Sequence, residues 1–180
     1  MTRTWDLWGS VIIAGAFALP LAAVAVLLLS RRRTRRGHPA PLRTALADVG
    51  IATGTAPWIW MILTPGTGQE GVSLIPLADL AEVFQAPPET VFVQVGGNLL
   101  VFAALGALLP VRTAPLASPP RVAAVAAAAS LLVETLQYVL ELGRFSSVDD
   151  VLINTAGAVG AAMITRRWWA PDVTDAPQPG

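Results

Sequence analysis

Seven polar side chains stand inside or beside apolar stretches of this sequence, where unpaired polar groups are costly. Each of them should therefore face protein, water or a ligand. They combine three carboxylates, three primary amides and a guanidinium, and they are Asn98, Glu134, Gln137, Arg144, Asp149, Asp150 and Asn154. In a ligand site the guanidinium would donate as a fork to phosphate or carboxylate, and the amides would fix orientation. The carboxylates would accept from amines, or bind a hard cation that bridges to phosphate.

Spacing indicates that most of these groups meet. Glu134 and Gln137 are three residues apart, and Asp150 and Asn154 are four apart, so each pair lies on one side of a helix. The short turn after Leu142 makes the helices before and after it antiparallel neighbours. The sequence therefore predicts one polar site shared by these two helices.

Depth brings a third helix to the same level. At a rise of about 1.5 Å per residue, Asn98, Glu134 and Asn154 lie roughly 9–12 Å below the outer ends of their helices. Two other interpretations stay open. The same side chains can simply hydrogen-bond helices together, or Glu134 can act as the general acid or base of an enzyme.

The composition limits metal and cofactor chemistry. The chain has no Cys, and its only histidine is His38. Thiolate ligands and sites built on several histidines are therefore excluded, and no metal site is predicted. The sequence identifies no cofactor and indicates no nucleic-acid partner.

The elements that carry the polar groups read as membrane-spanning helices. Only 13% of the residues are charged and 54% are hydrophobic, against about 25% charged in a typical soluble domain. A span needs about 20 mainly apolar residues. We expect an all-α, polytopic membrane bundle of about five transmembrane helices, with a short outer-surface helix at 77–86 and spans near 8–29, 45–64, 91–109, 121–142 and 148–165. The third span should stop at Pro110. Gly157 and Gly160 should let the fifth span pack closely on the fourth.

Arginine placement predicts the orientation. All twelve basic residues are arginines, and six of them lie from Arg31 to Arg43. With that loop inside, ten of the twelve fall on the cytoplasmic side, leaving Arg3 and Arg144 outside. The N-terminus is then outside and the C-terminus inside. Trp5 and Trp8 at the outer boundary, and tryptophans 168–169 at the inner one, agree with this orientation.

Three motifs resemble those of the VanZ-like family of bacterial membrane proteins. The most specific has the pattern E-x-x-Q, then R, then D-D-x-x-x-N-x-x-G, matched at Glu134–Gln137, Arg144 and Asp149–Gly157. A second, N-x-L-x-F-x-P-x-G, is matched at 98–106, with Ala104 where the pattern has proline. The third, N-L-x-P-F, is matched loosely at 73–77. Further departures are Ser73 for Asn, Leu77 for Phe, and Ser147 where many members are acidic.

The resemblance covers residues 72–161 and implies a role in the cell envelope that touches teicoplanin susceptibility. It supplies no established reaction. We expect one VanZ-like transmembrane domain over 1–169 and a disordered tail at 170–180. The leading hypothesis is a cell-membrane protein that binds the headgroup of an envelope lipid or lipid-linked precursor in an outward-facing polar site. The alternatives are a membrane enzyme that modifies such a lipid, and a structural or partner-binding membrane protein.

Overall fold

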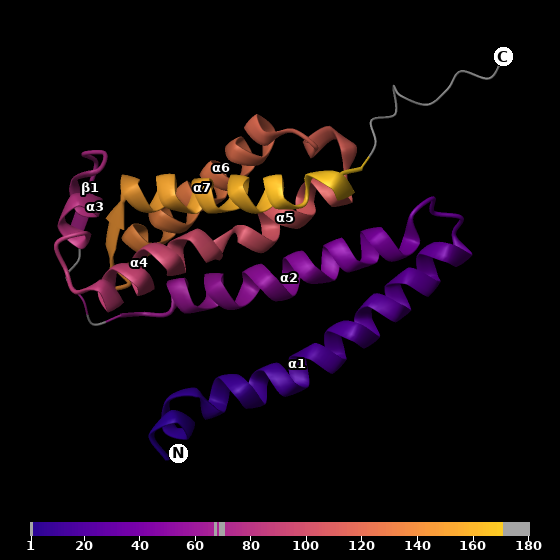
Figure 1. The fold of residues 1–180 in the computed structure, drawn as a ribbon, viewed down its shortest axis with the longest axis horizontal. Coiled ribbons are helices and arrows are strands. Elements are labelled where there is room, and N and C mark those ends of the chain that lie inside the picture. Colours follow the sequence, from indigo (N-terminus) through magenta and orange to yellow (C-terminus); the bar gives the residue numbers. More distant parts are fainter. Residues whose placement is uncertain (1, 67, 69–70, 171–180) are drawn as a thin grey trace.

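The computed structural model describes residues 2–66, 68 and 71–170, with side chains described from residue 17 onward. The chain forms a helical bundle with two very short strands (Figure 1), so the predicted all-α class is confirmed. In order, the elements are α1 (Thr2–Arg35), α2 (Pro41–Leu63), β1 (Gly71–Ser73), α3 (Ala78–Val83), α4 (Pro88–Val101), α5 (Ala103–Arg112), η1 (Ala114–Leu116), α6 (Pro119–Val139), β2 (Phe145–Ser147), α7 (Val148–Ile164) and η2 (Arg166–Trp168). The predicted tail falls almost entirely at 171–180, which lie outside the described residues.

Within the described residues, three helical segments are long and apolar enough to cross a membrane, namely Pro41–Leu63, Pro88–Arg112 and Pro119–Val139. They correspond to the second, third and fourth predicted spans. The first predicted span lies within α1, and the fifth coincides with α7, which has 17 residues and a length of about 25 Å. That these two helices also cross the membrane stays a prediction.

The third span is broken into α4 and α5. Phe102, between the two helices, has φ −110° and ψ 13°, outside regular helical geometry. The expectation that Pro110 ends this span is wrong, because Pro110 lies inside α5 and the helix continues to Arg112. A proline removes only its own N–H bond to the preceding turn, and neighbouring helices can hold the rest of the ladder.

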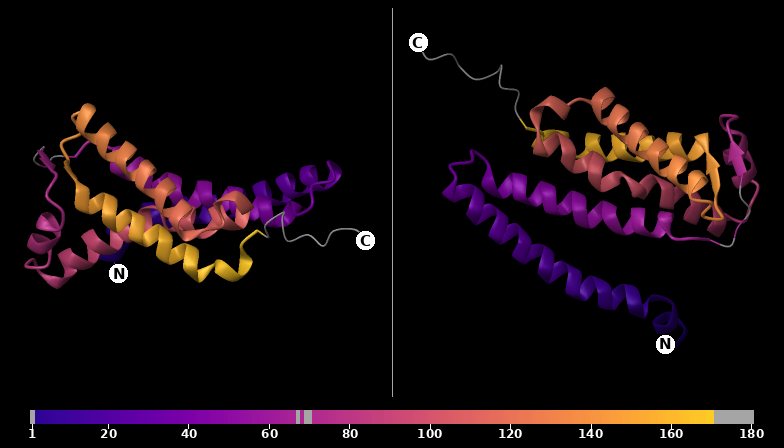
Figure 2. Two further views of the ribbon diagram at one scale, coloured as in Figure 1. Left: turned by 90° about the horizontal axis from the view of Figure 1, so that it is seen from above. Right: turned by 180° about the vertical axis from the view of Figure 1, so that it is seen from behind.

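α7 lies at the centre of the bundle, where it packs against α4, α5 and α6 (Figure 1). α2 packs against α5 and α6, and α1 packs against α2 at the edge of the molecule. α1 diverges from α2 toward its N-terminal end (Figure 2). The buried core between the helices consists mainly of small and β-branched side chains, namely Val101, Phe102, Val122, Ala126, Val133, Ala158 and Ala162.

Glycines bring α7 against α4 and α5. A Cβ at Gly157 would lie 2.1 Å from the carbonyl oxygen of Leu99, and a Cβ at Gly106 would lie 2.1 Å from that of Ala158. A Cβ at Gly160 would meet nothing within 4 Å. Gly157 therefore supports close packing, but against α4 rather than against α6 as predicted, and Gly160 supports none.

One carboxylate joins three helices at the end of the bundle opposite β1. Asp48 on α2 accepts hydrogen bonds from Arg33 on α1 and from Nε of Arg112 on α5, the latter at 2.6 Å. Arg33 and Arg112 both belong to the set of arginines predicted to be cytoplasmic. The pairing fixes the C-terminal end of α1 to the rest of the bundle.

At the other end, the segment after α2 runs along the turn between α6 and α7. β1 pairs in parallel with β2, with Gly71 opposite Phe145 and Ser73 opposite Ser147. The N–H of Gly66 donates to the carbonyl of Leu142 at 2.7 Å. The predicted outer-surface helix is present as α3, which is shorter than 77–86. These contacts build the wall around the polar residues.

Candidate functional site

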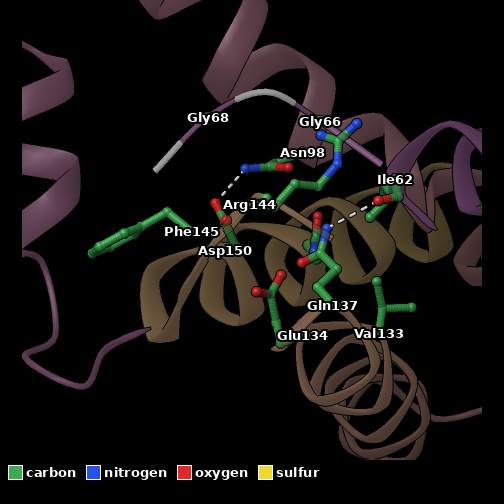
Figure 3. A pocket seen from close by; sticks show the side chains of 12 residues that line it. Ile62, Gly66, Gly68, Asn98, Val133, Glu134, Gln137, Arg144, Phe145 and Asp150 are labelled. Carbon is green, nitrogen blue, oxygen red and sulfur yellow. Dashed lines mark hydrogen bonds between the residues drawn. The ribbon is translucent and has the colours of Figure 1, made fainter. Parts of the chain in front are cut away.

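A cavity of about 690 Å³ lies between α2, α4, α6 and α7, below the paired strands. Six of the seven predicted site residues line it, and Figure 3 shows Asn98, Glu134, Gln137, Arg144 and Asp150 around it. The described lining consists of Ile62, Gly66, Gly68, Asn98, Val133, Glu134, Gln137, Gly143, Arg144, Phe145, Asp150 and Asn154. The polar groups of three helices thus meet at one cavity.

Glu134 projects from the buried face of α6. Ser130, Glu134 and Gln137 recur at helical spacing on this face, which packs toward α7. The Glu134 side chain is 8% exposed, and its Oε2 accepts the N–H of Ser147 at 3.2 Å. The Ser146 hydroxyl donates to the main-chain carbonyl of Glu134 at 3.1 Å. β2 therefore holds Glu134 in place through neutral donors.

Asp150 lies in the first turn of α7 and accepts a hydrogen bond from the side-chain amide of Asn98 on α4. Within the described part of the chain, neither Asp150 nor Glu134 forms an ion pair. The carboxylates face the same cavity (Figure 3). Two like charges in one partly buried site repel each other, so a cationic or strongly donating ligand would stabilise this arrangement.

The two remaining amides are tied from below. Asn154 is 3% exposed, and its Nδ2 donates to the Ser130 hydroxyl at 2.8 Å. Its Oδ1 is buried and has no hydrogen-bond partner among the described residues. Nε2 of Gln137 donates to the carbonyl of Ile62 on α2 at 3.2 Å. Asn154 therefore presents an unused acceptor at the cavity.

Arg144 spends much of its guanidinium on the protein itself. Its Nε donates to the carbonyl of Thr64 at 3.1 Å, and its Nη2 donates to the carbonyl of Met61 at 3.0 Å. Both carbonyls are at the C-terminal end of α2, where a cation is favourable to the helix dipole. Nη1 is the one guanidinium nitrogen without a partner among the described residues. The forked donation predicted for Arg144 is thus directed mainly at α2.

Asp149 does not line this cavity, although it neighbours Asp150. It is 2% exposed, its Oδ1 accepts the N–H of Leu77 at 2.5 Å, and its Oδ2 accepts the N–H of Leu80 at 2.9 Å. Asp149 therefore holds the start of α3. This occupation gives no support to the ligand-binding role predicted for Asp149.

Sequence reasoning missed two serines that support the site. Ser130 is fully buried and binds Asn154, and Ser147 gives its N–H to Glu134 and its hydroxyl to Asp79. Ser130 lies four residues before Glu134, which is one helical turn. Ser147 precedes an Asp-Asp pair, the pattern of a helix N-cap, and its Oγ does accept the N–H of Asp149.

The oxygen-rich lining does not form a metal cage. Over the described residues, no group of three or more His, Cys, Asp and Glu side chains is arranged to hold a metal ion. What the cavity offers instead is a set of acceptors, from Glu134, Asp150 and Asn154, beside one guanidinium.

The motifs that carry these side chains recur in a known family, whose description is VanZ/LLP1 and whose model matches residues 51–169. The chain belongs to the VanZ/LLP1 family. The match covers about two thirds of the chain, from α2 to η2, and it confirms the resemblance seen in the sequence. No curated protein and no solved structure matches the chain. Family membership and the three apolar helices together agree with a membrane protein, and α1 lies outside the matched VanZ/LLP1 region.

Proposed function

We propose that this VanZ/LLP1 protein binds the headgroup of an envelope lipid, or of a lipid-linked envelope precursor, in the cavity between α2, α4, α6 and α7. In this proposal the chain crosses the membrane five times, with the N-terminus outside and the C-terminus in the cytoplasm. The cavity then opens on the outer side. Membrane lipids are its partners, and through this binding the protein would alter susceptibility to teicoplanin.

One observation carries the proposal. Glu134 and Asp150 face a single cavity, and no cationic side chain in the described residues pairs with either of them. Residues that only fasten helices together should satisfy one another and leave little space. Here a cavity of about 690 Å³ separates them, and the Oδ1 of Asn154 is also without a partner among the described residues.

The arrangement favours a headgroup rich in donors, above all one with an ammonium group. Ammonium offers three donors and a positive charge, and it would lie between carboxylates that otherwise repel. The free Nη1 of Arg144, at the same cavity, can donate to the phosphate that such headgroups carry. An ammonium near Glu134 and Asp150 with its phosphate near Arg144 would match the order of charges in the lining.

Binding is tested with the purified protein in nanodiscs that contain phosphatidylethanolamine or phosphatidylglycerol, with retained lipid measured by native mass spectrometry. Glu134→Gln should weaken retention of phosphatidylethanolamine roughly tenfold, as expected for a lost charged hydrogen bond of about 1.5–3 kcal/mol. Glu89→Gln is the matched control, because Glu89 is an exposed carboxylate in the first turn of α4.

A Glu134→Gln protein that melts normally and retains the lipid as well as wild type would overturn the proposal. The same samples, analysed for altered lipid after incubation, separate binding from catalysis. A modified lipid formed by wild type but not by Glu134→Gln would favour the enzyme in which Glu134 is the acid or base.

A further inference from the structure

A second cavity, of about 550 Å³, adjoins the polar one. The two cavities share Ile62, Asn98, Arg144, Phe145 and Asp150 as lining residues. We propose that the second cavity holds a hydrocarbon chain of the same lipid whose headgroup occupies the first. This inference rests on the proposed function and adds that the ligand is recognised as an intact lipid.

The walls of the second cavity are apolar where α2 and α4 face each other. Trp58 and Met61 come from α2, and Val93 and Val101 come from α4. Met61 is 52% exposed and Val93 is 68% exposed, so the cavity is open on the outside of the bundle. Both helices belong to segments that are apolar enough to cross a membrane. A chain would therefore pass between them directly into the bilayer.

The other end of this cavity is polar but has its own partners. Asp79 accepts from the Ser147 hydroxyl, and Asp149 accepts from two main-chain N–H groups of the α3 region. These carboxylates are thus held by neutral donors of the protein. The polarity falls from α3 toward α2 and α4, and the direction matches a lipid with its headgroup outward and its chain running into the membrane.

Gly97 keeps the second cavity open. It lines the cavity, and a Cβ built there would meet no atom within 4 Å. The adjacent Gly96 is equally free of neighbours but is not part of the lining. A larger side chain at position 97 therefore enters the cavity rather than another helix, whereas the same change at position 96 leaves the cavity unchanged.

The probe is phosphatidylethanolamine with a photoactivatable diazirine in its acyl chain, added to the full chain in nanodiscs. Crosslinked residues are mapped by mass spectrometry. We expect crosslinks at Trp58, Met61 and Val93, reduced at least fivefold by Gly97→Leu and unchanged by Gly96→Leu. Crosslinks at Trp60, which is 80% exposed on α2 and lines neither of these cavities, report the surrounding bilayer and should not change.

A second measurement does not depend on the variants. Glycerophosphoethanolamine, which has the same headgroup and no acyl chain, should compete for the wild-type site at least tenfold more weakly than a short-chain phosphatidylethanolamine. Equal competition, or crosslinks in the second cavity that survive Gly97→Leu in a normally melting protein, would overturn the inference. Lipid retention that stays sensitive to Glu134→Gln in that case would leave the proposed function standing, and its loss of sensitivity would end both.

Discussion

Asn98 on α4 donates a hydrogen bond to the carboxylate of Asp150 on α7, across 52 residues of sequence. The bond joins two helices that are separated in the chain by α5 and α6. It also fixes one of the two carboxylates at the cavity without neutralising it, because an amide carries no charge. The site is therefore built by neutral groups that orient charged ones.

The Asn98–Asp150 bond should be measurable as coupling in a double-mutant cycle. Asn98→Ala and Asp150→Ala should each lower the melting temperature in detergent, and the double variant should lose less than the sum. We expect a coupling of about 0.6–2 kcal/mol, the range measured for hydrogen bonds between membrane helices. Additive effects would show that the two side chains do not interact in the folded protein.

Much of the site could be predicted because helical spacing and one short turn constrain it. Glu134, Gln137, Asp150 and Asn154 share helix faces, and the turn between α6 and α7 forces those faces together. Asn98 could not be placed in this way, since α4 reaches α7 only through packing at Gly157. Close approach of two helices depends on which glycine meets which backbone, and the spacing of Gly157 and Gly160 alone did not distinguish α4 from α6.

The roles of Arg144 and Asp149 were beyond the sequence for a related reason. Their partners are main-chain groups of Met61, Thr64, Leu77 and Leu80. Every residue has such groups, so they leave no trace in the pattern of residue types. The break between α4 and α5 is equally silent, because Phe102 is an ordinary apolar residue within a continuous apolar run.

Gly157→Leu should destabilise the bundle strongly. The new Cβ would fall 2.1 Å from the carbonyl oxygen of Leu99, so α4 and α7 must separate. Overpacking of a core costs about 1–3 kcal/mol, which should appear as a clearly lower melting temperature in detergent. Gly160→Leu in the same helix is the control, since a Cβ there meets nothing within 4 Å. Equal melting temperatures for the two variants would contradict the packing of α7 on α4.

The arginine distribution predicts the topology of the chain. Reporter fusions after Arg43 and after Arg167 should both read as cytoplasmic, and a fusion after Gln85, just beyond α3, should read as external. With alkaline phosphatase and a fluorescent protein as paired reporters, each position gives one positive and one negative signal. A cytoplasmic signal at Gln85 would be incompatible with five spans and with a cavity open to the outside.

Attachment of α1 should depend on Arg33 rather than on the neighbouring arginines. Arg33 pairs with Asp48, whereas Arg32 is exposed. Arg33→Gln should lower the unfolding free energy by up to about 1 kcal/mol, because the pair is partly open to solvent. It should also speed proteolysis in the loop before α2. Arg32→Gln removes the same charge and should change neither measurement, so matching effects of the two variants would show that only net charge matters.

Neighbouring aspartates at the start of α7 should have separable roles. Asp149 accepts the N–H groups of Leu77 and Leu80, and Leu77 has a φ of +66°, a left-handed conformation that is unfavourable for leucine. Asp149→Asn replaces one acceptor oxygen with a donor that faces an N–H, so the start of α3 should loosen at a cost of about 1–3 kcal/mol. Amide hydrogen exchange at Leu77 and Leu80 should become much faster in this variant. Asp150→Asn should leave those two amides protected and should instead weaken retention of phosphatidylethanolamine. Exchange at Leu77 that rises equally in both variants would mean that the two carboxylates act as one structural unit, and that Asp150 is not free to serve a ligand.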